Sequence, residues 1–216
     1  MYKLAVFDMD GTILDTLEDL MDSMNYILRK FGCPERNLDE IRSFVGNGIL
    51  KLVERSFPEG TSESDIKKAF EMFNPYYKEH CAVKTKPYDG ICDVICELGK
   101  RGVLTAVVSN KPDYGVQSLC KEYFNGMFDF AVGEKEGIRK KPYPDSVNEV
   151  LSHFGIKKED AVYIGDSEVD VKTAENAGLD CIGVEWGFRG REMLVSLGVK
   201  NLVSQSSELL DYFNVE

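Results

Sequence analysis

The sequence predicts an α/β fold in which a doubly wound parallel sheet is interrupted by an inserted all-helical domain. Two observations predict it. Short apolar runs rich in β-branched residues alternate with helix-like sequence, which is typical of right-handed crossovers between parallel strands. The interval between the first and second of these runs is far longer than a single crossover helix requires, so we expect a further domain inside it.

The expected strands are short. The stronger candidates are residues 4–7, 103–108, 161–164 and 181–184. Weaker candidates at residues 128–132 and 202–203 continue the alternation of strand and helix. Together these runs indicate a parallel sheet at the centre of the fold.

The long interval opens with the pattern of an amphipathic helix. Apolar residues between positions 17 and 31 recur at the spacing of one helix face. We predict that Thr16 and Asp19 form a capping box at the start of this helix. Gly32 is expected to end it.

The rest of the interval is also expected to be helical. Further helices are predicted over residues 38–45, over residues 49–57 and after Ser62. We therefore expect a helical domain over residues 15–84. It interrupts a sheet domain made of residues 1–14 and 85–216.

Composition excludes several kinds of partner. The chain has 216 residues, of which 43% are hydrophobic and 29% charged, and its formal net charge is −11. Because this charge repels phosphate backbones and anionic membranes, we expect neither nucleic acid nor a membrane as a partner. No leader-like or membrane-length run is present, so a cytoplasmic protein with its six cysteines reduced is expected. The sequence does not indicate an oligomeric state.

Residues able to do chemistry gather where the predicted strands finish. Asp8 and Asp10 end the first strand, the segment 109–111 ends the second, and Asp166 ends a third. In open parallel sheets, ligands bind beyond the carboxyl ends of the strands, so we expect these residues to converge. Lys141 follows a weaker strand by a loop and can reach the same edge.

The aspartates predict a metal site. Asp8 and Asp10 lie two apart on a strand and face the same way, so their mutual repulsion calls for a cation. Asp166 adds a carboxylate, and Asp170 adds another one helical turn later. Oxygen ligands of this kind suit Mg²⁺. The predicted metal residues are Asp8, Asp10, Asp166 and Asp170.

The same residues predict phosphate-ester hydrolysis. A carboxylate is already ionised at neutral pH, so Asp8 can attack phosphorus without a separate base. Asp10 would protonate the leaving oxygen and then activate water. Lys141 would neutralise the phosphoryl oxygens. The predicted catalytic residues are Asp8, Asp10, Ser109 and Lys141. The predicted phosphate-binding residues are Met9, Gly11, Thr12, Ser109, Asn110 and Lys141.

Four segments resemble the four motifs of the haloacid dehalogenase superfamily: DMDGT at 8–12, VVSN at 107–110, Lys141-Pro142 and GDSEVD at 165–170. The resemblance spans the whole chain and implies a Rossmann-like core. It implies the phosphatase branch, with Asp8 as nucleophile and Asp10 as general acid and base. Magnesium would then be bound by Asp8, Asp166 and the backbone carbonyl of Asp10, with Asp170 in support. The helical insert is similar to the C1 caps of that family.

Further stretches resemble the phosphoglycolate phosphatase group: FVGNG at 44–48, SNK at 109–111, KPYP at 141–144 and VEWGF at 184–188. The resemblance implies a small phosphorylated metabolite as substrate, with phosphoglycolate as the leading candidate. Pyrophosphate, sugar phosphates and nucleotides are alternatives, because related capped enzymes share most of these stretches. A phosphomutase is less favoured, since the first insert helix has no His. A receiver-like phospho-acceptor module is also less favoured, since it would have no helical insert.

Some residues keep two interpretations. Lys111 is either part of the site or a solvated charge. The turn at residues 46–48 either separates two helices or brings backbone N–H groups to an anion. Trp186 either packs in the fold or belongs to a loop over the site.

Overall fold

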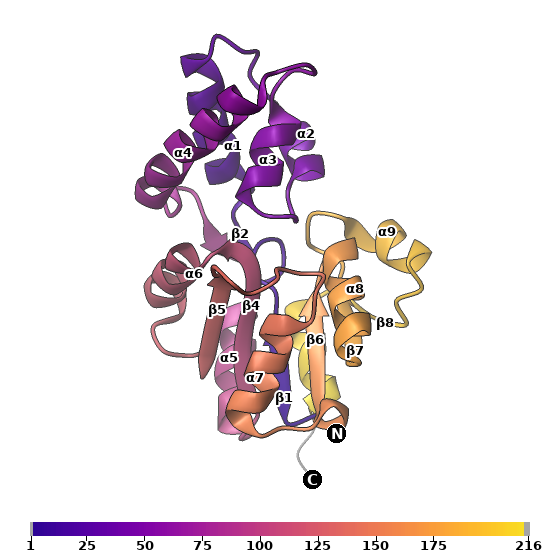
Figure 1. Ribbon diagram of the computed structural model, residues 1–216. Helices are drawn as coiled ribbons and strands as arrows, with labels where there is room; N and C mark the ends of the chain where they lie inside the picture. Colours follow the sequence, from indigo (N-terminus) through magenta and orange to yellow (C-terminus); the bar gives the residue numbers. More distant parts are fainter. Residues whose placement is uncertain (1, 214–216) are drawn as a thin grey trace. The chain divides into compact units, whose positions relative to one another are not determined.

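The computed structural model of the protein describes residues 2–213 and divides into two compact units. A six-stranded parallel sheet forms the centre of the larger unit (Figure 1). Its strand order is β5-β4-β1-β6-β7-β8, and every neighbouring pair is parallel. The strands are β1 (Leu4–Phe7), β4 (Leu104–Pro112), β5 (Phe130–Glu134), β6 (Ala161–Gly165), β7 (Asp180–Val184) and β8 (Asn201–Val203). The order runs outward from β1 in both directions, which confirms the predicted doubly wound sheet.

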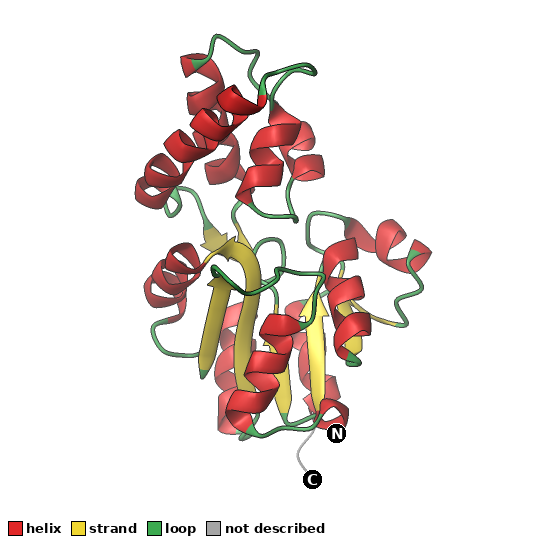
Figure 2. Cartoon of the chain, in the orientation of Figure 1, coloured by secondary structure: helices red, strands yellow, loops and turns green. Residues whose placement is uncertain are grey.

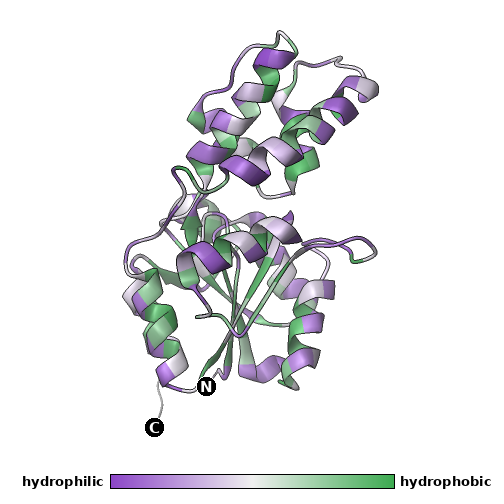
Figure 3. Cartoon of the chain, turned by 90° about the vertical axis from the view of Figure 1, so that its left-hand side faces the viewer, coloured by the Kyte–Doolittle hydropathy of each residue, from purple (hydrophilic) through white to green (hydrophobic). Residues whose placement is uncertain are grey.

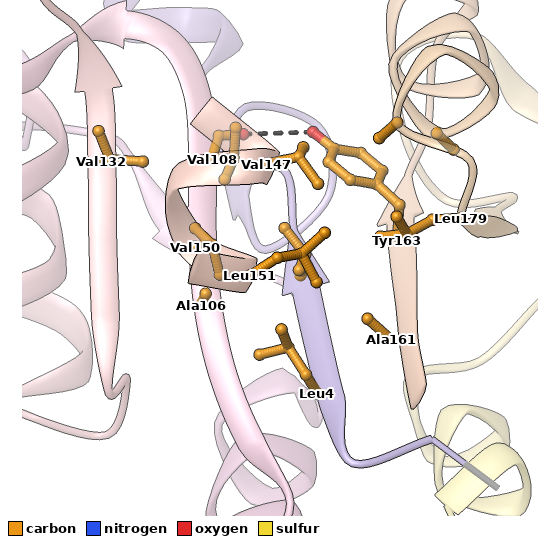
Figure 4. Close-up of a cluster of buried hydrophobic side chains, with 13 residues drawn as sticks. Leu4, Ala106, Val108, Val132, Val147, Val150, Leu151, Ala161, Tyr163 and Leu179 are labelled. Carbon is orange, nitrogen blue, oxygen red and sulfur yellow. Dashed lines mark hydrogen bonds between the residues drawn. The ribbon is translucent and has the colours of Figure 1, made fainter. Parts of the chain in front are cut away.

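Helices cover both faces of this sheet (Figure 2). On one face, α7 (Asp145–Phe154) and α8 (Glu168–Ala177) pack against a buried cluster that includes Leu4, Val108 and Tyr163 (Figure 4). All residues of β1 are fully buried, as a strand covered on both sides requires. The remaining elements of this unit are α5 (Ile91–Lys100), α6 (Asp113–Leu119), η1 (Cys120–Phe124), η2 (Lys158–Asp160), α9 (Gly190–Ser196) and η3 (Ser206–Phe213).

The smaller unit, residues 16–86, is helical. Its helices are α1 (Leu17–Lys30), α2 (Leu38–Phe44), α3 (Ile49–Ser56) and α4 (Glu63–His80), each within two residues of its expected start. The larger unit comprises residues 1–15 and 87–216. A separate two-stranded sheet pairs β2 (Leu14–Asp15) with β3 (Lys86–Pro87).

Asp19 does not form the predicted capping box. Thr16 precedes α1 without a side-chain hydrogen bond to the helix amides. The Asp19 carboxylate, only 2% exposed, instead accepts hydrogen bonds of 2.8 to 3.0 Å from the backbone N–H groups of Val83, Lys84 and Thr85. These donors satisfy a buried charge, which a single local cap bond would not do. Asp19 therefore ties the end of the helical unit to its first helix.

Hydropathy follows burial in the structure. Figure 3 shows hydrophobic residues along the strands of the sheet, whereas the surrounding helices carry both hydrophobic and hydrophilic residues. Amphipathic helices of this kind bury one stripe and expose the other. Over residues 2–213, no helix combines the length and the apolar character that crossing a membrane needs.

Candidate active site

The carboxyl ends of β1 and β6 bring two of the predicted site residues to one edge of the sheet. Phe7 of β1 is in register with Val107 of β4 and Ile164 of β6. Asp8 follows Phe7 directly, and its N–H donates to the carbonyl oxygen of Ile164 at 2.9 Å. Asp166 comes two residues after Ile164. The backbone pairing of parallel strands therefore fixes the relative positions of Asp8 and Asp166.

Lys141 joins two of the carboxylates. Its Nζ lies 2.7 Å from Asp8 Oδ1 and 2.8 Å from Asp170 Oδ1. It also donates to the Tyr163 hydroxyl at 3.0 Å. Burial acts to lower the pKa of Lys141, but the charges of Asp170 and Asp8 raise it well above its usual value. Lys141 is therefore a fixed cation inside a buried site.

Several donors hold the Asp170 carboxylate. Lys141 occupies Oδ1, while Oδ2 accepts from the N–H and the hydroxyl of Ser167 at 3.0 and 2.7 Å. The Tyr163 hydroxyl lies 3.3 Å from Oδ1 and 3.3 Å from the carbonyl oxygen of Val108, the bond drawn in Figure 4. Its single proton serves one of these acceptors at a time. Because its acceptor positions are occupied, Asp170 suits holding Lys141 better than binding a metal directly.

Asp8, Asp166 and Asp170 form a buried acidic cluster. One carboxylate oxygen from each lies within 4.8 Å of the others. Burial and then the charge of Asp170 raise the pKa of Asp8 well above its ordinary value, against the opposing charge of Lys141. The same two causes raise the pKa of Asp166 to about 7. Lys141 alone therefore leaves the cluster short of positive charge.

This acidic cluster fits a divalent cation. The ligand atoms that it offers are all carboxylate oxygens, which Mg²⁺ prefers. A bound cation would also relieve the excess negative charge of the cluster. Glycine keeps the approach open, since a Cβ at Gly11, where φ is +88°, would lie 2.6 Å from Asp166 Oδ2. The Thr12 hydroxyl donates to Asp166 Oδ1 at 3.1 Å and so orients that carboxylate.

The Asp10 side chain pairs with Lys111 and does not belong to the acidic cluster found among the described residues. Lys111 Nζ lies 3.0 Å from Asp10 Oδ1. Lys111 is only 3% exposed, so its interpretation as a solvated charge is wrong. A Cβ at Gly115 would lie 3.2 Å from Lys111 Cγ and Cδ, so the absence of a side chain there leaves room for the lysine stem.

Ser109 and Asn110 follow the apolar part of β4 and are both buried. Ser109 Oγ accepts the N–H of Lys111 at 3.1 Å, which leaves the hydroxyl proton for another acceptor. Asn110 Nδ2 donates to the carbonyl oxygen of Lys141 at 3.0 Å. Asn110 thus connects the end of β4 to the loop that carries Lys141, a support that the motif alone did not indicate.

Two of the backbone amides predicted to bind phosphate are engaged within their own loop. The Gly11 N–H donates to the carbonyl oxygen of Leu14 at 2.9 Å, and the Thr12 N–H donates to that of Met9 at 3.2 Å. In this conformation neither amide can also donate to a phosphoryl oxygen. Met9 is itself fully buried, so its side chain anchors the loop in the core.

Comparison with known proteins decides the family. The haloacid dehalogenase-like hydrolase family matches residues 5–184. The chain belongs to this family. Phosphoglycolate phosphatase 1 of Pseudomonas aeruginosa is 32% identical to it over 192 residues, which cover 86% of this chain and 70% of that protein. The phosphoglycolate phosphatase of Haemophilus influenzae is 28% identical over 195 residues, which cover 87% of each.

Solved structures of this family agree with the fold. A provisionally assigned phosphoglycolate phosphatase from Lactobacillus delbrueckii subsp. bulgaricus is 39% identical, with a TM-score of 0.93 and coverage of 100% of this chain and 99% of that one. CbbY from Rhodobacter sphaeroides, in complex with phosphate, is 26% identical, with a TM-score of 0.77 and coverage of 97% and 96%. These likenesses confirm the predicted superfamily, the α/β fold and the enzyme class, a phosphatase.

Proposed function

We propose that this phosphatase hydrolyses a small phosphate monoester through an aspartyl-phosphate on Asp8, with phosphoglycolate as the leading substrate. The position of the buried Asp8 carboxylate carries the proposal. Its Oδ1 lies 2.7 Å from Lys141 Nζ, and one of its oxygens lies within 4.8 Å of a carboxylate oxygen of Asp166 and one of Asp170. A nucleophile, a fixed cation and a site for a divalent metal are the parts that phosphoryl transfer uses. The choice of phosphoglycolate is supported by the curated relatives that bear its name.

We propose Mg²⁺ as the metal. Asp8 and Asp166 would hold it, together with the backbone carbonyl of Asp10 that the family resemblance implies. Asp170 would act indirectly, by holding Lys141 at 2.8 Å. When bound, Mg²⁺ supplies positive charge that screens Asp8 from the negative phosphoryl group.

In the first step, an oxygen of Asp8 forms a bond to phosphorus while the bond from phosphorus to the leaving oxygen breaks. Asp10 gives a proton to that oxygen. In the second step, a water attacks phosphorus and gives a proton to Asp10, and the bond between phosphorus and Asp8 breaks to release phosphate. Lys141 keeps its proton through both steps, because its pKa is raised, and neutralises a phosphoryl oxygen.

A screen of phosphate release tests the substrate. We expect phosphoglycolate to give a higher kcat/KM than pyrophosphate, sugar phosphates and nucleoside monophosphates, in the presence of Mg²⁺. A clear preference for one of the other compounds would replace phosphoglycolate and leave the phosphatase chemistry standing. Transfer of the phosphoryl group to a sugar hydroxyl would indicate a mutase. Stable phosphorylation without turnover would indicate an acceptor module and overturn the proposal.

Lys111→Met is expected to slow turnover on the order of tenfold or more, because Asp10 loses the cation that fixes its carboxylate. The methionine keeps the buried stem, so the fold should persist. Steady-state kinetics and thermal unfolding check this prediction. Lys100→Met is the matched control. The Lys100 side chain is 68% exposed, and its described ion pair is with Glu97, one turn earlier in the same helix. Equal rates in the two variants would contradict a role for Lys111.

The raised pKa of Asp166 predicts pH-dependent metal binding. Because the metal-free carboxyl has a pKa of about 7, a proton competes with Mg²⁺ below that pH. We expect the affinity for Mg²⁺ to fall by at least about tenfold for each pH unit below 7, because Asp8, the other proposed carboxylate ligand, also has a raised pKa. Calorimetric titrations across this range check the slope. An affinity that is flat or that rises on acidification is incompatible with this competition.

The same shift predicts how stability changes with pH. Between about pH 4 and about pH 7, the folded metal-free protein binds a proton at Asp166 that the unfolded chain has lost, so the Asp166 contribution to the free energy of unfolding falls as pH rises. Asp166→Asn lacks this contribution. We therefore expect the Tm of the metal-free wild type, relative to that of Asp166→Asn, to fall as pH rises through this window.

A further inference from the structure

The segment 186–189, between β7 and α9, takes no part in the proposed chemistry but contacts the acidic cluster and its neighbouring loop. The Trp186 indole N–H donates to the carbonyl oxygen of Thr12 at 3.0 Å. The backbone N–H of Phe188 donates to Asp166 Oδ2 at 2.7 Å. The Thr12 hydroxyl donates to the other oxygen of Asp166. These bonds close a ring that runs from Trp186 through Thr12 and Asp166 to Phe188 and back along the chain.

Gly187 allows this segment to approach so closely. A Cβ at that position would overlap the Asp166 side chain and lie 2.5 Å from the carbonyl oxygen of Gly11. The backbone of the segment therefore rests directly on both loops, the one after β1 and the one after β6. A loop that only shielded the core from solvent would not need its backbone in direct contact with the Asp166 side chain and the Gly11 carbonyl group.

Arg189 fixes the far end of the segment. Its Nε lies 3.0 Å from Glu168 Oε2, and a second guanidinium nitrogen lies 3.4 Å from Oε1. The Arg189 side chain is only 11% exposed, whereas that of Glu168 is 40% exposed, so the arginine end of this two-point contact is the buried one. Glu168 begins α8, two residues after Asp166. The segment is thus attached on either side of the Asp166 carboxylate.

We propose that residues 186–189 form a positioning segment for the metal site, with Trp186 as its anchor. Donors on both oxygens prevent the Asp166 carboxylate from rotating, while each oxygen keeps a lone pair for a cation. The Trp186 bond holds Thr12, and Thr12 holds Asp166, so the indole N–H acts on the metal through another residue. Outer contacts of this kind typically change metal affinity by about 10- to 100-fold. The inference rests on the proposed function only in that Asp166 binds Mg²⁺.

Trp186→Phe tests the indole N–H, because it removes this donor and keeps an aromatic ring. We expect the Kd for Mg²⁺, measured by calorimetry on the full chain without substrate, to rise by about tenfold. The Tm of the metal-free protein should change little. Raising Mg²⁺ should restore kcat, which loss of folded protein would not allow. Arg189→Gln is a milder change at the other end and should weaken Mg²⁺ binding in the same direction.

Tyr2→Phe is the matched control. The Tyr2 hydroxyl donates to Asp180 Oδ2 at 2.6 Å, at the end of β7 opposite to Trp186. Like Trp186→Phe, this variant removes one aromatic hydrogen-bond donor and keeps an aromatic ring. Its Kd for Mg²⁺ should equal that of the wild type. Wild-type affinity in both Trp186→Phe and Arg189→Gln would overturn the positioning role and leave the metal site intact. Absence of Mg²⁺ binding to the wild type would remove the metal site and this inference with it.

Discussion

Asp8→Asn is expected to abolish turnover, with a loss in kcat/KM on the order of 10⁴-fold or more. The amide has nearly the shape of the carboxylate but carries no charge, so it cannot capture the phosphoryl group. Lys141 keeps Asp170 and Tyr163 as partners in this variant, so the fold should persist. Phosphate release under saturating Mg²⁺ measures the loss, and circular dichroism checks the fold.

Asp39→Asn is the matched control for this substitution. Its side chain is 86% exposed and pairs with Arg42 on the surface of α2, so the same chemical change should leave the rate unaltered. Surface pairs of this kind contribute little to stability. A rate near that of the wild type in Asp8→Asn would rule out Asp8 as the nucleophile.

Lys141→Met is expected to lower the rate on the order of 10²-fold or more, because a positive charge in a buried site is removed from the phosphoryl oxygens. It should also destabilise the metal-free protein by about 3–5 kcal/mol, since Asp8 and Asp170 lose the cation between them. Added Mg²⁺ should recover part of that stability by supplying charge to the same cluster. Kinetics and thermal unfolding with and without Mg²⁺ measure both effects.

Lys140→Met provides the comparison for Lys141. The neighbouring lysine is 38% exposed and its Nζ lies 3.3 Å from Glu134, away from the acidic cluster. We expect its loss to change neither the rate nor the response to Mg²⁺. If the two lysine variants behaved alike, the bridge between Asp8 and Asp170 would have no functional role.

The strands of the sheet could be predicted because their buried positions are apolar in unbroken runs. β1 begins and ends at the residues that the sequence indicates. β4, in contrast, continues past residue 108 to Pro112. The added residues are mostly polar, and the register with β5 shifts between Val108 and Pro112. No apolar run marks that extension, so the sequence could not reveal it.

The motif residues of the candidate site could be predicted because parallel strands place their carboxyl ends at one edge. Contacts between distant parts of the chain could not. Asp19 has the spacing of a cap residue, yet its partners begin 64 residues later, at Val83. Trp186 and Thr12 are 174 residues apart. The burial of Lys111 depends on tertiary packing, which the local sequence does not encode.

The central claim is that Asp8 carries the phosphoryl group during turnover. Acid quenching of the wild type at millisecond times, with Mg²⁺ and labelled phosphoglycolate, followed by peptide mass spectrometry, tests it most directly. We predict a transient phosphoryl group on Asp8 that forms and decays at rates compatible with kcat. A label on another side chain, or released phosphate with no labelled protein at any time, would contradict the account.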